Sequence, residues 1–202
     1  MAIRQRRARW SRAELCTYLL EPKNWLAVTV LGIGWHADRA AGLRWGLLAL
    51  VFAAVLPMVF IGYGVRRGRW TDRNVGARRP RLLVLCFIMA STGTGLILLV
   101  VLRAPRQLAG YLAFMLVSVA WLALVSAVWK ISIHCAVAAG SVTILAYAFG
   151  PPLLSAFALV AALCWARVAM RDHTLAQVLA GSVLGAAVAA VAYTVTSGFA
   201  AT

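Results

Sequence analysis

The chain has 202 residues, of which 63% are hydrophobic and 12% are charged. Soluble domains are about 45–50% apolar and about 25% charged, so the composition excludes a soluble globular protein and predicts one membrane domain over residues 1–202. Twenty Lys and Arg against five Asp and Glu give a net charge of +15. This charge suits anionic lipid as a partner, and nucleic acid is not expected, because the sequence has no zinc spacing or recognition-helix pattern.

In chain order, residues 1–23 form a basic tail, in which we expect no removable signal peptide. A short apolar helix is predicted over residues 25–36. It is too short to cross a membrane unless it extends through His36, Asp38 and Arg39. Otherwise it lies in the membrane interface or re-enters the membrane from the same side. An all-α core of six transmembrane helices follows over residues 45–198, in the runs 45–65, 82–102, 108–129, 131–149, 151–170 and 174–198.

Small residues in these runs predict packing rather than chemistry. Gly181 and Gly185 lie four apart in the last run, so a neighbouring helix can approach closely there. The cysteines show no C-x-x-C pair and no histidine spacing, so we expect no metal site, and those within apolar runs are expected to be small buried hydrophobic residues. The four cysteines are Cys16, Cys86, Cys135 and Cys164, of which the last three lie in apolar runs.

Ionisable residues gather in three clusters at the ends of predicted helices, where a charge is less costly than at membrane depth. The clusters are the loop 66–81 with seven arginines and Asp72, the pair Lys130 and His134, and the group Arg167, Arg171, Asp172 and His173. Two predicted helices separate each cluster from the next, and two crossings return the chain to the same side. We therefore expect the three clusters to converge at one membrane face.

Arginine forks and helix N-termini bind phosphate oxygens, and imidazoles supply a nucleophile and a proton donor near neutral pH. The converged clusters therefore predict a phosphate site. Two structural interpretations stay open: arginines after a span commonly set topology, and a lone histidine at a helix start commonly has a packing role. Under these interpretations the chain is a scaffold protein.

Three spacings stand out: Arg167, His173 and Gln177; Ser132 and His134; and Arg79 before Pro80. In them the sequence resembles the type-2 phosphatidic acid phosphatase family, integral-membrane lipid phosphatases with a six-helix core. The family's third motif reads Ser-Arg, five residues, His, three residues, Asp. Its second reads Pro-Ser-Gly-His, and its first reads Lys, six residues, Arg-Pro. The resemblance covers about residues 66–185.

The resemblance implies hydrolysis of a lipid phosphate in two steps, with no metal or other cofactor. The substrate would be phosphatidic acid, phosphatidylglycerol phosphate, or a polyprenyl phosphate or diphosphate. His173 would attack phosphorus and form a phosphohistidine, oriented by Gln177, and His134 would protonate the leaving alkoxide. The residues implied to hold the phosphate are Arg79, Arg167, Lys130, Arg73 and Ser132.

Four departures from the family's motifs bear on the chemistry that the resemblance implies. Gln177 replaces the Asp that orients the nucleophile, and it can accept a hydrogen bond but brings no charge. Asp72 stands at the lysine position of the first motif, and Ile131 and Ile133 replace Pro and Gly of the second. The alternative is therefore a divergent member that binds a lipid phosphate or diphosphate with little hydrolysis, or with different chemistry.

We expect a multi-pass integral membrane protein, as in a bacterial cell membrane, and the sequence leaves the oligomeric state open. The side of the site depends on the short run 25–36. If this run crosses, 16 basic residues lie with the site and four lie opposite, and the positive-inside rule makes the site cytoplasmic. If it does not cross, the split is ten to ten. Bacterial members of the family usually have this site on the outer face.

Overall fold

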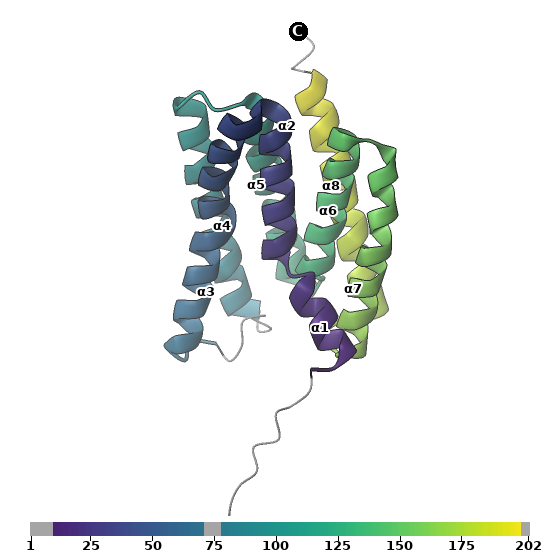
Figure 1. The fold of residues 1–202 in the computed structure, drawn as a ribbon. Helices are drawn as coiled ribbons and strands as arrows, with labels where there is room; N and C mark the ends of the chain where they lie inside the picture. Colours follow the sequence, from purple (N-terminus) through teal and green to yellow (C-terminus); the bar gives the residue numbers. More distant parts are fainter. Residues whose placement is uncertain (1–9, 71–77, 199–202) are drawn as a thin grey trace, which may run out of the picture.

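The structure is a computed structural model that describes residues 10–70 and 78–198. Its helices lie side by side in one bundle, and the described residues contain no strand (Figure 1). The elements are α1 (Arg12–Leu19), α2 (Pro22–Leu50), η1 (Val51–Val55), α3 (Leu56–Arg66), α4 (Arg78–Val101), α5 (Arg106–Val128), α6 (Ile133–Phe149), η2 (Pro151–Ala156), α7 (Phe157–Ala169) and α8 (Leu175–Gly198). The predicted all-helical fold is confirmed.

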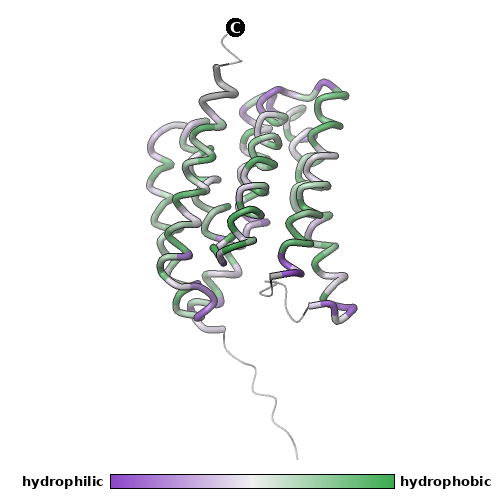
Figure 2. Tube along the Cα trace, turned by 180° about the vertical axis from the view of Figure 1, so that it is seen from behind, coloured by the Kyte–Doolittle hydropathy of each residue, from purple (hydrophilic) through white to green (hydrophobic). Residues whose placement is uncertain are grey.

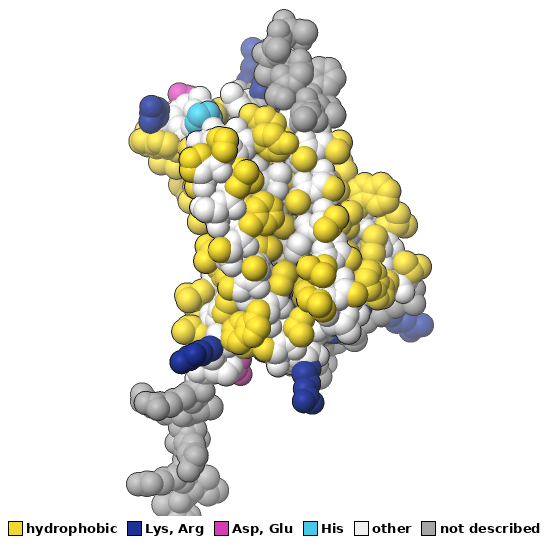
Figure 3. All heavy atoms as spheres, turned by 90° about the vertical axis from the view of Figure 1, so that its right-hand side faces the viewer, with side chains coloured by type: hydrophobic (Ala, Val, Ile, Leu, Met, Phe, Trp, Pro, Cys, Tyr) yellow, Lys and Arg dark blue, Asp and Glu magenta, His cyan; other side chains and the backbone are white. Residues whose placement is uncertain are grey.

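Apolar helices dominate the bundle. Five helical runs are long and apolar enough to cross a membrane, namely Arg12–Arg66, Arg79–Val101, Arg106–Val128, Pro151–Ala169 and Leu175–Tyr193, and α6 is apolar but shorter. Polar residues gather at the two ends of the bundle, with apolar stretches between them (Figure 2). On the side seen in Figure 3, hydrophobic side chains cover the middle and basic ones lie at the ends. These features are compatible with an integral membrane protein.

The element α2 consists of two antiparallel halves. Asp38 (φ −157°, ψ 44°) and Arg39 (φ 41°, ψ −123°) interrupt its helical backbone. Gly34 then faces Gly42, and a Cβ on Gly34 would lie 2.5 Å from the Gly42 carbonyl oxygen, so the two halves approach backbone to backbone. Residues 22–37 therefore leave the end of the bundle that bears α1, and residues 40–66 return to it (Figure 1). The short helix expected over residues 25–36 is the greater part of the first half.

A π-helical turn, η1, interrupts the helix that the sequence predicts over residues 45–65. Pro57 has no N–H to donate to the Ala53 carbonyl, and its ring crowds that turn, so the helix widens there. The Ser91 hydroxyl donates to the Phe52 carbonyl at 2.6 Å, which satisfies an acceptor in the widened turn. Ala53 and Ala54 consequently face the interior and are buried.

Helices α6 and α8 pack closely, as Gly181 and Gly185 predicted. A Cβ on Gly181 would lie 2.5 Å from the Ser132 carbonyl oxygen, and one on Gly185 would collide with the Ala136 carbonyl. The Ser132 N–H also donates to the Gln177 carbonyl at 3.2 Å. These contacts hold the start of α6 against the start of α8.

The three cysteines in apolar runs are not all buried, although the sequence predicted burial for each of them. Cys135 is buried and Cys164 is half-buried, whereas Cys86 is exposed on the outer face of α4. The prediction for Cys86 was wrong because the outside of a membrane helix is as apolar as its interior, so hydropathy does not tell which face is buried.

Candidate functional site

A cavity of about 200 Å³ lies near the end of the bundle where α7 ends and α8 begins. The three clusters that the sequence analysis expected to converge all contribute side chains to it, together with the start of α2. Its ionisable lining residues are Glu21, Lys23, Arg81, Lys130, His134, Arg167, Asp172 and His173. Both predicted catalytic histidines therefore face one cavity.

The turn between α7 and α8 fixes the ring of His173. Its Nδ1 lies 3.2 Å from Oε1 of Gln177. The Thr174 N–H donates to the same oxygen at 3.1 Å, and the Gln177 N–H donates to the Thr174 hydroxyl at 3.4 Å, which forms a capping box at the start of α8. Because this oxygen is an acceptor, the neutral ring carries its proton on Nδ1 and keeps the lone pair on Nε2. Nε2 is then the nucleophilic atom.

The surroundings of His173 favour its neutral form. Burial and the positive charges of Arg167 and Lys130 lower the pKa of His173 from 6.5 to about 4. The hydrogen bond with Gln177 and the charge of Asp172 oppose this shift. His173 is therefore unprotonated near pH 7, as a nucleophile requires.

Asp172 pairs with Arg167 rather than with the ring of His173. Its Oδ2 lies 3.0 Å from Nη1 of Arg167, whose side chain is 3% exposed. Lys130 donates from Nζ to the Asp172 carbonyl at 2.8 Å. Arg171, which precedes Asp172, has φ 58°, so the backbone of this turn is irregular. An irregular turn is the condition under which the Asp172 carboxylate could orient the ring of its neighbour His173. The carboxylate instead neutralises part of the cationic lining, and Gln177 remains the direct partner of His173.

Arg79 and Arg81, near the start of α4, lie in different environments. Arg79, which the resemblance places on the phosphate, is exposed and is not among the described residues that line the cavity. Arg81 is buried and lines it, and its Nη2 donates to the Ser126 carbonyl at 3.4 Å. The sequence left a topological role open for the arginines of the loop 66–81, Arg81 among them, and the resemblance implied no phosphate contact for Arg81. Arg73 and Asp72 lie outside the described residues.

Ser132 has a structural position. It caps α6, and its buried hydroxyl accepts the Cys135 N–H at 3.4 Å. It is not among the described residues that line the cavity, whereas its neighbours Ile131 and Ile133 are. The structure gives Ser132 a capping role, and its phosphate contact stays a prediction.

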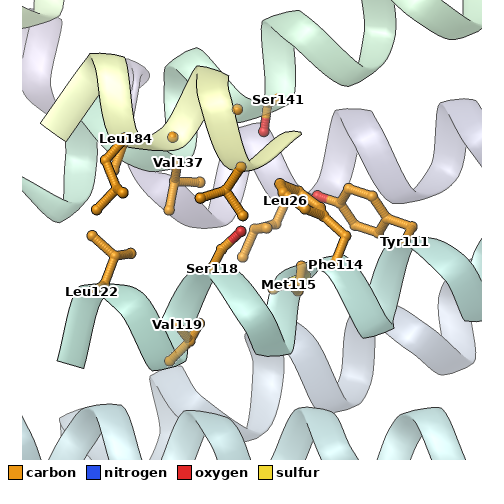
Figure 4. A pocket seen from close by; sticks show the side chains of 14 residues that line it. Leu26, Tyr111, Phe114, Met115, Ser118, Val119, Leu122, Val137, Ser141 and Leu184 are labelled. Atoms are coloured by element: carbon orange, nitrogen blue, oxygen red, sulfur yellow. The ribbon is translucent and has the colours of Figure 1, made fainter. Parts of the chain in front are cut away.

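A second cavity, of about 50 Å³, lies among α2, α5, α6 and α8. Side chains such as Phe114, Met115, Leu122 and Leu184 surround it (Figure 4). The described residues that line it carry no charge, so it offers an anion no opposite charge. Leu26 borders both cavities and separates this apolar space from the charged one.

The charged cavity thus combines two imidazoles with arginine and lysine side chains, residue types that are able to hold a phosphate group and to supply a nucleophile to it. Among residues 10–70 and 78–198, no three His, Cys, Asp or Glu side chains are grouped as a metal site would need. Searches for similar proteins found no matching family model, no matching curated protein and no matching solved structure.

Proposed function

We propose that the chain is a membrane lipid phosphatase that hydrolyses a phosphomonoester or diphosphate of a lipid through a phosphohistidine, without a metal ion. One observation carries the proposal: His173, His134 and Arg167 line the same cavity. They come from the α7–α8 turn, α6 and α7, and from positions 39 residues apart at the extremes. Packing alone does not require that these particular side chains meet.

The cations of the cavity come from different walls and suit a phosphate group. Arg81 projects from α4, Lys130 from the loop before α6, and Arg167 from α7. Arginine forks bind phosphate oxygens in pairs, and the low polarity of a buried site strengthens these bonds. We assign Arg81 and Arg167 to the non-bridging oxygens, with Lys130 contributing charge while it holds the α7–α8 turn.

The proposed reaction has two steps. Nε2 of His173 forms a bond to phosphorus as the ester P–O bond breaks, and His134 gives a proton to the leaving lipid alkoxide. A water molecule then gives a proton to His134 and attacks phosphorus, which breaks the P–N bond and releases phosphate. The negative substrate favours the imidazolium form of His134 that the first step needs, because opposite charges stabilise each other.

The shape of the cavity supports a lipid substrate. We call the part of the cavity lined by Arg81, Lys130, His134, Arg167 and His173 its charged floor. The other walls are apolar, with Leu26, Ala53, Leu85 and Ile88 among the lining residues. Arg81 and Ile88 lie seven positions apart on α4, which corresponds to about 10 Å along the helix. The hydrocarbon part of a substrate would lie along these walls, with the phosphate on the floor.

We further propose that the first half of α2 crosses the membrane together with the six predicted core helices. The reversal at Asp38 and Arg39 supports this topology, because it places Pro22 at the same end of the bundle as His173. The count of 16 basic residues against four then applies, and the positive-inside rule places the site at the cytoplasmic face.

One observation favours the alternative, a protein that binds a lipid phosphate with little hydrolysis. Gln177 brings no negative charge to His173, and Asp172 is paired with Arg167. In a serine-protease triad, replacing the orienting Asp by Asn costs about 10⁴ in turnover. Binding with slow turnover is the outcome if no other group stabilises the phosphorylated ring.

A phosphate-release assay on lipid phosphates in detergent micelles, with and without a chelator, tests the proposal. We expect release in both conditions, and we expect His173→Gln and His134→Gln to abolish it. His36→Gln is the matched control, because His36 is exposed and lies two residues before the reversal, at the opposite end of the bundle. Full activity of His173→Gln would refute the mechanism. Binding of lipid phosphate without release would favour the alternative.

A further inference from the structure

Two cysteines from different helices meet beside the charged cavity. Cys135 lies in the first turn of α6, directly after His134, and Cys164 lies on α7, one helical turn before Arg167. Their side chains pack in one buried cluster, and the two thiols form a hydrogen bond with each other. No sequence motif pairs them, so this contact is a product of the fold.

A chain of hydrogen bonds runs through the two sulfur atoms and orients both thiol protons. The Ser132 hydroxyl donates to Cys135 Sγ at 3.2 Å. Cys164 Sγ lies 3.5 Å from Oγ of Ser182, which donates its own proton to the Val178 carbonyl at 2.9 Å. The Cys164 S–H therefore donates to Ser182, and the Cys135 S–H is left to donate to Cys164 Sγ.

The two thiols differ in access. Cys135 is fully buried, whereas Cys164 is half-buried. The large exposed side chains on α7 are apolar, namely Leu159 and Trp165, so the surface around Cys164 suits hydrocarbon. Arg167, one turn along the same helix, brings a positive charge to this neighbourhood, and reactive cysteines lie near cations and are partly exposed. A reagent in the lipid therefore meets Cys164 first, with Cys135 directly behind it.

We propose that Cys135 and Cys164 are a redox-active thiol pair, which a hydroperoxide dissolved in the membrane oxidises to a disulfide that joins α6 to α7. Redox-sensitive cysteines are commonly accessible and placed next to a second cysteine that resolves the oxidised sulfur. The disulfide links the residue after His134 to a residue one turn from Arg167, so it fixes the separation of two side chains of the charged floor. This inference goes beyond the proposed function and does not depend on it.

The oxidation has two balanced steps. Cys164 Sγ attacks one peroxide oxygen, the O–O bond breaks, and the thiol proton leaves with the other oxygen as an alcohol, so that Cys164 becomes a sulfenic acid. Cys135 Sγ then attacks the sulfur of Cys164, the S–O bond breaks, and the hydroxyl leaves with the Cys135 proton as water. The hydroperoxide gains two electrons, and the thiol pair loses two.

The test uses the full-length protein in lipid vesicles. The chain has four cysteines, so Cys16→Ala and Cys86→Ala leave the pair as the only thiols. The oxidant is cumene hydroperoxide, and the readouts are the number of thiols that react with maleimide after unfolding and the mass of the intact chain. We expect both thiols to be lost together, with a mass decrease of two hydrogen atoms, and a dithiol reductant to restore them.

Two matched variants in the same background assign the roles of the two sulfur atoms. Cys135→Ala and Cys164→Ala each exchange a cysteine for a small apolar residue in the same packed cluster. We expect Cys135→Ala to stop at the sulfenic acid of Cys164, which dimedone traps. Cys164→Ala should lose its remaining, buried thiol at least about tenfold more slowly.

Thiols that persist at an oxidant concentration that converts the exposed Cys86 of the parent chain would overturn the proposal. A disulfide that forms between two chains rather than within one would overturn it as well. Equally fast trapping of Cys135 in Cys164→Ala would contradict the order of the two steps. None of these readouts uses phosphate release, so this proposal and the proposed hydrolysis fail separately.

Discussion

Replacing Arg81 and Arg79 separately by Gln tests whether burial or motif spacing identifies the phosphate ligand. The two residues are two positions apart on α4, so their substitutions have the same chemistry and nearly the same place in the chain. Arg81 is 8% exposed and lines the charged cavity. Arg79 is exposed, although the resemblance implies that it holds the phosphate.

The expected magnitude follows from the bonds that each side chain can make. A buried guanidinium that donates two charge-assisted hydrogen bonds of about 1.5 kcal/mol each contributes about 3 kcal/mol, or roughly 150-fold in kcat/KM. A solvent-exposed guanidinium near an anion contributes at most about 1 kcal/mol, or roughly fivefold. We therefore expect Arg81→Gln to lose at least about tenfold more activity than Arg79→Gln.

The assay is phosphate release against lipid phosphate concentration in mixed micelles, with inhibition by vanadate as a second reading of anion binding. Arg81 also donates to the Ser126 carbonyl, so the thermal unfolding midpoint of each variant is needed to separate folding from binding. Arg81→Lys keeps the charge but loses the fork, and it should fall between the parent and Arg81→Gln. A larger loss in Arg79→Gln, with Arg81→Gln folded and active, would refute the assignment.

Three further predictions follow from the surroundings of His173 and from the topology. Gln177→Glu keeps the acceptor for the Thr174 N–H and adds a charge beside Nδ1, so we expect kcat to rise about tenfold or more, measured under substrate saturation. Because protonated His173 cannot attack phosphorus, kcat/KM should fall as the pH drops through about 4, and Lys130→Met should move this limb to higher pH in a pH–rate profile. Arg69→Cys, in a chain whose native cysteines are replaced, should react with an impermeant maleimide in inside-out vesicles and not in intact cells.

Each of these predictions has a result that contradicts it. Lower turnover in Gln177→Glu, with unchanged folding, would show that a negative charge beside His173 hinders the reaction. An acidic limb near pH 6.5 would mean that His173 is not shielded by the neighbouring cations, or is not the nucleophile. Labelling of Arg69→Cys from outside intact cells would reverse the proposed sidedness.

The boundaries of most helices could be predicted from the sequence. An unbroken apolar run of about 20 residues has one stable form in a membrane, because only a helix satisfies its backbone there. The predicted runs 108–129 and 174–198 accordingly differ from α5 and α8 by two residues or fewer at each end. The convergence of His134 and His173 could be predicted because two membrane crossings lie between them and return the chain to the same side. This argument needs no knowledge of side-chain packing.

The reversal in α2 could not be predicted in the same way. Its signal was Asp38 next to Arg39, a charged pair inside an apolar stretch, which fits an interfacial segment as well as a turn. What decides between them is the contact of Gly34 with Gly42, and this contact depends on the two halves already being antiparallel. A pair of glycines eight residues apart is too common in apolar helices to indicate a hairpin by itself.

The choice between Arg79 and Arg81 depends on which face of α4 is inward. Helical spacing places Arg81 in line with Val84, Leu85 and Ile88, which line the cavity, and places Arg79 in line with Leu83 and Cys86, which are exposed. In a soluble helix the exposed line would be polar, and the periodicity would identify the buried arginine. Here both lines are apolar, since lipid makes no demand for polar residues on the outer face. A membrane helix therefore lacks the periodic pattern of polar residues that would have shown that Arg81 is the buried arginine.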